Sequence, residues 1–196
     1  MVKPISNSLI AFAALAISQS AYADPKIIAA AELFAERTVS TWLTDPMIVT
    51  AIKVQNAQNA GLSQADIDAL DKQWRAESKD SQGPLISKLI QNSLSEFLRG
   101  VKDEGEGLMT EIFIMDDKGL NVGQSDITSD FWQGDEAKWQ KTFSAAPKSM
   151  FVDEVEMDES TQRFQTQVSI AITDPDTGKN IGAVTIGVDA ENLLMQ

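Results

Sequence analysis

The residues of this chain that could do chemistry are carboxylates, cations and aromatic rings, because the sequence contains no histidine and no cysteine. Their absence removes the common acid–base schemes and thiol nucleophiles. The sequence has no glycine-rich phosphate loop. Adjacent acidic residues such as Asp153 and Glu154 would point to opposite faces of a strand. We therefore expect no enzymatic activity, and a hydrolase that relies on carboxylates alone is the less favoured alternative.

Asp189 is the first candidate for a ligand-binding residue. It ends the last apolar stretch of the chain, in strand parity with Ala183, Thr185 and Gly187. The side chains at these positions form a small and partly polar surface, which is typical of the floor of a pocket. Thr185 is therefore a candidate as well. The alternative is that Asp189 caps the helical turn that follows it, and the two roles are compatible.

Two tryptophans in a polar stretch are the second candidate. Trp132 and Trp139 lie on either side of Gly134, and Phe131 precedes them. Aromatic walls of this kind can hold an alkyl chain, or a cation by cation–π attraction. The alternative is that the rings close the core beneath the loop, which is the more common role for a residue such as Phe131.

A cation could bind a carboxylate group of the ligand. Arg163, at the start of a predicted strand, could do so with two parallel hydrogen bonds. Lys138, Lys141 and Lys148 are alternatives, and each could equally be a solvated surface charge. The acidic stretch Asp174–Gly178 lacks the ligand spacing of a calcium loop and is typical of a turn, so we expect no metal and no cofactor.

The elements that must position these residues divide the chain in two. Helical spacing of apolar residues dominates residues 24–104, and alternation with period two dominates residues 108–196. Asp24-Pro25 and Asp45-Pro46 are typical of helix starts, and a single helix is expected over 84–101. Strands are expected over 108–116, 120–125, 149–157, 163–173 and 181–189. Helices followed by antiparallel strands indicate the α+β class, with the helices on one face of the sheet and the tryptophan loop over the other.

The N-terminus predicts export. Lys3, an apolar run and Ala21-Tyr22-Ala23 together are typical of a secretory signal peptide, residues 1–23, cleaved after Ala23. We therefore expect a periplasmic protein with no membrane insertion. The formal net charge of −13 disfavours nucleic acid and anionic lipid as partners.

Two motifs resemble the Cache (PDC) family of extracytoplasmic sensor domains. These are Ile114-Met115-Asp116-Asp117-Lys118-Gly119 and Gly187-Val188-Asp189, and the likeness in plan runs from Asp24 to the C-terminus. The resemblance implies a single PAS-like sensor domain over 24–196, with long N-terminal helices (24–104) packed on a five-stranded antiparallel sheet (108–196). It further implies a small ligand such as an amine, an amino acid or a carboxylate, with Asp189 holding the ligand ammonium.

Family members are usually ectodomains of chemoreceptors, histidine kinases or cyclases. This chain departs from that pattern, because the sequence predicts a cleavable signal peptide and no transmembrane helix. It therefore resembles a free-standing periplasmic member that signals through a membrane receptor or kinase. Amino-acid-binding members also use tyrosines near the loop, whereas the one tyrosine here is Tyr22, which disfavours an α-amino acid. The alternative function is a ligand-free protein–protein interaction module, and the long helices would offer a surface for a homodimer.

Overall fold

The computed structural model describes residues 24–158 and 163–196. The expected signal peptide, 1–23, lies outside the described residues, and so does part of the predicted connection between the third and fourth strands. No helix in the described ranges is long and apolar enough to cross a membrane.

Helices occupy the first half of the chain, as the periodicity predicts. Asp24 and Asp45 each cap a helix that begins with proline, and their carboxylates accept hydrogen bonds from the backbone N–H groups of Lys26 and Met47. The elements are α1 (Pro25–Arg37), the 3₁₀ turn η1 (Val39–Thr41), α2 (Pro46–Asn59), α3 (Gln64–Glu77), η2 (Ser78–Asp80), α4 (Pro84–Ile90) and α5 (Ser93–Glu104).

The single helix expected over 84–101 is wrong, because the chain breaks at Asn92 into α4 and α5. The Asn92 side chain accepts a hydrogen bond from the backbone N–H of Ser95 at 2.7 Å, which caps α5. Its amide also donates to the carbonyl of Val122 at 2.9 Å. One asparagine thus starts the second helix and ties the junction to the sheet.

The strands form a six-stranded antiparallel sheet in the order β2-β1-β6-β5-β3, with β4 also paired to β5. Their bounds are β1 (Met109–Met115), β2 (Asn121–Gln124), β3 (Met150–Val152), β4 (Glu156–Asp158), β5 (Arg163–Thr173) and β6 (Asn180–Asp189). The expected count of five is wrong, because the predicted strand 149–157 divides into β3 and β4. The division lies at Asp153, whose carboxylate accepts a hydrogen bond from the next backbone N–H at 2.9 Å.

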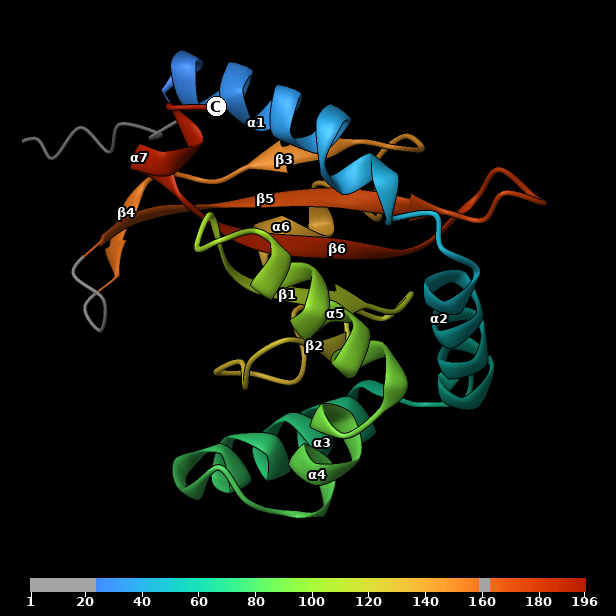
Figure 1. Cartoon of the computed structure of the whole chain (residues 1–196). Helices are drawn as coiled ribbons and strands as arrows, with labels where there is room; N and C mark the ends of the chain where they lie inside the picture. Colours follow the sequence, from blue (N-terminus) through green and yellow to red (C-terminus); the bar gives the residue numbers. More distant parts are fainter. Residues whose placement is uncertain (1–23, 159–162) are drawn as a thin grey trace, which may run out of the picture.

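Each face of the sheet has its own cover (Figure 1). α1 and α5 lie on the side that we call the helix face, where the main hydrophobic core buries residues such as Ile112, Ile114 and Ile186. The short helix α6 (Ala137–Gln140) lies behind the sheet, over the opposite side, which we call the loop face. The predicted α+β class, with long N-terminal helices packed on an antiparallel sheet, is confirmed.

Two further helices extend the molecule beyond the edge strand β2. α3 and α4 pack on each other there, around a second buried cluster that includes Ile67, Trp74 and Leu120. α2 stands beside the sheet and contacts β6 and β2 through its buried residues Ile48 and Ile52. A last short helix, α7 (Ala190–Leu193), follows β6 directly.

Candidate functional site: the loop face of the sheet

The loop face carries one continuous row of side chains across five strands. The strand register places Gln124, Phe113, Thr185, Ser169 and Phe151 side by side on β2, β1, β6, β5 and β3. Paired residues of antiparallel strands point to the same face, so these five belong to one surface. The row therefore places two hydroxyls between two aromatic rings, with the amide of Gln124 beyond Phe113 at the β2 end.

The polar groups of this row are fully buried. The Ser169 and Thr185 hydroxyls share a hydrogen bond of 2.9 Å, and both residues have no exposed surface. Gln124 is equally buried, and its Oε1 accepts hydrogen bonds from Asn121 and Thr128. Its Nε2 has no hydrogen-bond partner among the described residues. The neighbouring Asn121 Oδ1 is likewise buried without a partner among the described residues. Unpaired buried polar atoms of this kind cost stability.

Residues 125–148, which we call the Trp loop, cover this row. Trp139 packs against Phe113, Met115 and Ala183, and its ring stacks on Phe143 with the ring centroids 4.9 Å apart. The predicted ring candidate Trp139 and the predicted floor residue Thr185 thus both neighbour Phe113 on the loop face. The Trp loop is the element that separates the loop face from solvent.

Lys138 brings a cation beneath the Trp loop. Its Nζ lies 5.4 Å from the centroid of the Phe113 ring, and only 12% of its side chain is exposed. Glu136 pairs with it at 2.8 Å, and Gln133 accepts a weak hydrogen bond at 3.4 Å. Gln124 and Lys138 therefore both neighbour Phe113, one as its cross-strand partner and the other over its ring, and both can donate hydrogen bonds.

The structure places Trp132 and Phe131 away from this row. Phe131 is buried in the second cluster and stacks on Trp74 with ring centroids 5.6 Å apart. The backbone N–H groups of Phe131 and Trp132 both donate to the Asp71 carboxylate of α3, at 2.9 and 3.1 Å. These two candidates hold the start of the Trp loop against α3.

Asp189 and Arg163, the remaining candidates, lie together at the end of the sheet. An Arg163 Nη1 donates to Asp189 Oδ2 at 3.1 Å. Asp189 Oδ1 accepts from the backbone N–H groups of Glu191 and Asn192, both at 3.0 Å, and so caps α7. The capping role considered in the sequence is therefore present, and the buried carboxylate already has three donors.

The β1–β2 turn, residues 116–119, joins the Trp loop to α2. The indole N–H groups of Trp139 and Trp132 donate to the backbone carbonyls of Asp116 (3.1 Å) and Lys118 (2.8 Å). The Asp116 carboxylate accepts from the side-chain amides of Gln55 (3.0 Å) and Asn59 (2.8 Å) on α2. The same four-residue turn thus fastens both the loop and the helix.

Next in this turn, Asp117 has a pKa raised above its ordinary value, chiefly by desolvation and then by the neighbouring Asp116 charge. Gly119, at φ +82°, leaves room for the Trp loop, because a Cβ there would meet the backbone of Gly134 at 2.5 Å. The turn and the loop therefore meet backbone to backbone.

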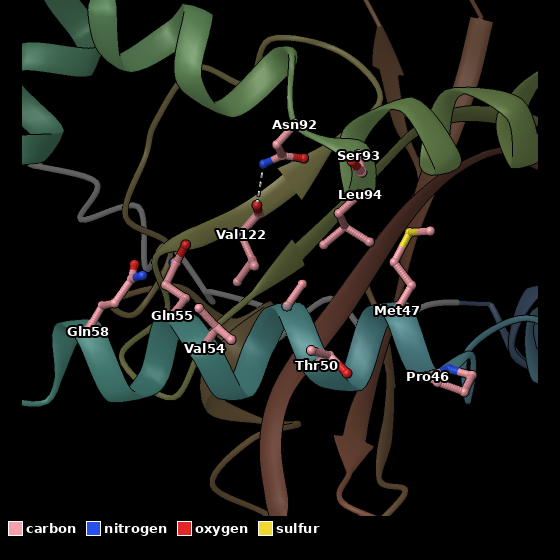
Figure 2. Close-up of a pocket in the computed structure, with 11 residues that line it drawn as sticks. Pro46, Met47, Thr50, Val54, Gln55, Gln58, Asn92, Ser93, Leu94 and Val122 are labelled. Atoms are coloured by element: carbon pink, nitrogen blue, oxygen red, sulfur yellow. Dashed lines mark hydrogen bonds between the residues drawn. The ribbon is translucent and has the colours of Figure 1, made fainter.

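A hollow of the surface lies between α2 and the α4–α5 junction (Figure 2). Its volume is about 540 Å³, and Met47, Val54, Leu94 and Val122 contribute apolar surface to it. Met47 and Val54 are 42% and 50% exposed. α2 is thus apolar both toward the sheet and toward solvent, which is the surface expected for the interaction-module alternative.

The residues that the sequence reading missed are Gln124, Phe113 and Ser169. The alternation of β1 and β5 carries the signal for Phe113 and Ser169, because it assigns both to the face opposite the helices. Nothing in the sequence signals Gln124, because its unpaired amide depends on tertiary packing. Within the described ranges, no three acidic residues gather as a metal site would require.

No family model matches the chain, and no curated protein matches it. Solved structures do match. The sensory domain of the Campylobacter jejuni chemoreceptor Tlp3 is 14% identical over 87% of this chain and 66% of that chain, with a TM-score of 0.41. The V. cholerae histidine kinase DctB sensor domain is 12% identical over 86% and 58%, with a TM-score of 0.39. The E. coli DcuS sensor domain is 18% identical over 65% and 94%, with a TM-score of 0.37.

The chain spans 61% to 66% of the length of the first three solved structures that it matches. The structures named above are sensory domains of chemoreceptors and histidine kinases, and they are of the Cache (PDC) type that the sequence motifs resemble.

Proposed function

We propose that this chain is a sensor module that binds a small carboxylate-bearing molecule between the loop face and the Trp loop. The observation that carries the proposal is the buried Gln124 Nε2, a hydrogen-bond donor without a partner among the described residues. A ligand oxygen at this point would remove the penalty of the unpaired donor, and binding would recover that free energy.

The neighbouring groups favour a carboxylate over a simple amine. Lys138 offers a charge-assisted hydrogen bond from beneath the Trp loop, where little solvent screens it. Phe113 and Trp139 offer apolar contact for the body of the ligand. Of the ligands that the resemblance implies, a simple amine would meet the like charge of Lys138 beside the row.

The predicted ligand-binding residues take different parts in this proposal. Trp139 and Thr185 contact the ligand directly. Trp132 and Phe131 hold the start of the Trp loop, so their effect on binding is indirect. Arg163 and Asp189 bind at the end of the sheet only if a ligand group displaces one from the other.

Binding requires the Trp loop to open, because the row beneath it is buried. The loop is fastened to the β1–β2 turn, and the turn is fastened to α2. In this proposal ligand binding changes the position of α2, which a periplasmic-side receptor or kinase, or a second copy of the chain, then recognises. The protein acts as a binding module and not as an enzyme.

The test is a thermal-shift screen of the purified protein against small carboxylates, amino acids and amines. A ligand at 100-fold over its Kd stabilises the folded state by about 2.7 kcal/mol, which such a screen detects. Each hit is repeated on Lys138→Gln, with Lys72→Gln on the exposed side of α3 as the control for loss of a charge. We expect a carboxylate hit that Lys138→Gln weakens at least tenfold and Lys72→Gln leaves unchanged.

A hit that both variants retain would place the ligand elsewhere and contradict the proposed site. A screen without hits, on folded protein, would favour the second candidate function. That candidate is a protein-binding module, and the exposed Met47 and Val54 of α2 support it (Figure 2).

A further inference from the structure

A separate hollow of about 400 Å³ lies on the helix face, between the C-terminal half of α1 and the edge of the sheet at β3. Ile170 and Ile172 of β5 form its floor, and Ala35, Leu43 and Met150 form its apolar walls. This volume lies in the range of small-molecule sites. The hollow is distinct from the loop face, because Ile170 and Ile172 alternate with the loop-face residue Ser169 along β5.

The hollow exists because β3 is short and because α1 presents a small side chain above it. β3 pairs with β5 only from Met150 to Val152, so the end of β5 extends past it. α1 passes over this region (Figure 1) and presents the small side chain of Ala35 to it. Apolar sheet residues that would otherwise meet a longer strand or a larger side chain are left lining a cavity.

The mouth of the hollow carries charges of both signs. Glu32 and Glu36 line it from α1, and Lys148 lines it from the segment before β3. None of the ion pairs among residues 24–158 and 163–196 involves these three side chains. Neither Glu32 nor Glu36 thus forms an ion pair with Lys148 at the mouth.

Glu32 and Glu36 both occupy positions on α1 that are unfavourable for a negative charge. Glu32 and Glu36 are one turn apart on α1, and like charges at this spacing repel. Glu36 also lies in the last turn of α1, where a negative charge opposes the helix dipole. Lys148 holds a left-handed backbone, with φ 63°, which is unfavourable for a side chain of this kind. A bound cation beside the two carboxylates would relieve their repulsion.

We propose that this hollow binds one molecule of a zwitterionic amphiphile. Its apolar chain lies on Ile170 and Ile172, its ammonium group lies between Glu32 and Glu36, and its anionic group meets Lys148. The chemistry commits to a single chain with adjacent positive and negative groups, because an apolar cavity with both signs at its mouth complements that arrangement. The site is independent of the proposed ligand under the Trp loop.

The probe for this site is dodecylphosphocholine below the concentration at which it forms micelles. Isothermal titration calorimetry on the full protein measures the affinity and stoichiometry. We expect one molecule per chain, with dodecyl maltoside, which has an uncharged headgroup, and phosphocholine, which has no chain, each binding at least tenfold more weakly. Equal binding of dodecyl maltoside would overturn the assignment of the charged mouth.

Two variants locate the probe. Ala35→Met fills the hollow from the partly exposed side of α1 and should weaken binding at least tenfold, whereas Ala76→Met on exposed α3 should not. Glu32→Gln combined with Glu36→Gln should weaken binding several-fold and raise the melting temperature of the free protein. Unchanged affinity in Ala35→Met would overturn the site.

Two further outcomes separate this hollow from other places where the probe could bind. Lys138→Gln should leave the affinity for dodecylphosphocholine unchanged, so loss in that variant would mean that the probe occupies the loop face instead. Co-sedimentation of the protein with phosphatidylcholine vesicles would mean that the headgroup is recognised in a bilayer, and would overturn the single-molecule site.

Discussion

The two faces of the sheet are both buried at their centre and differ in chemistry. On the helix face, the alternating residues of β1 and β6 include Ile112, Ile114 and Ile186, each with no exposed surface. On the loop face, the same alternation gives Thr185 and, on β5, Ser169, which are just as buried. Burial therefore does not distinguish the proposed binding face from the core. Polar groups that the sheet buries at a cost to stability do distinguish it.

The largest effect should come from the helix face. We expect Ile186→Ala to reduce the free energy of unfolding by about 3–4 kcal/mol, because the surrounding α1, α5 and strands cannot fill the cavity. Urea denaturation measures this change. Val54→Ala, on the exposed side of α2, is the control and should cost little. A loss below about 1 kcal/mol for Ile186→Ala would mean that this face is loosely packed.

An intermediate effect should come from the hydroxyl pair of the loop face. Thr185→Val alone leaves the Ser169 hydroxyl without its partner and should cost about 1–2 kcal/mol. Combined with Ser169→Ala, it should cost less than the sum of the two single changes, by about 1 kcal/mol, because no buried group is then left unpaired. A double-mutant cycle in urea gives the coupling. Strict additivity would show that the hydrogen bond contributes nothing to the folded state.

The smallest effect should come from the β1–β2 turn, to which both the Trp loop and α2 are hydrogen-bonded. Asp117→Asn should raise stability by roughly 0.3–0.5 kcal/mol at pH 7, a modest figure because solvent screens this partly exposed side chain. The raised pKa sets the sign: folding disfavours the charged form, so the wild type gains stability as the pH falls through that pKa. Melting curves from pH 7 to 4 should therefore show the two proteins converging, and a constant gap would contradict this.

The fold was predictable because its signals are local. Proline after Asp24 and Asp45 marks two helix starts, and strict alternation marks β5 and β6 with their faces. The break at Asn92 was not predictable from periodicity, because the apolar stripe of residues 84–101 continues through both α4 and α5. The position of the break instead depends on the hydrogen bond from Asn92 to Val122 of β2.

The position of a candidate side chain was predictable only where strand parity decides it, as for Thr185 on the loop face. Trp132 and Trp139 have the same residue type and the same kind of donor. Yet Trp132 packs with the α3–α4 cluster, whereas Trp139 packs on the loop face. The difference depends on which surface the intervening chain meets after folding, and sequence spacing does not encode this. Gln124 was missed for the same reason.

The β1–β2 turn binds the Trp loop through backbone oxygens and α2 through a side-chain carboxylate. The tryptophans use backbone oxygens of Asp116 and Lys118, which every amino acid supplies, so no substitution at these positions removes the acceptors of the loop. α2 uses the carboxylate of Asp116, which a single substitution removes. A substitution at position 116 therefore removes two of the hydrogen bonds that hold α2, whereas the backbone acceptors of both tryptophans remain in the chain.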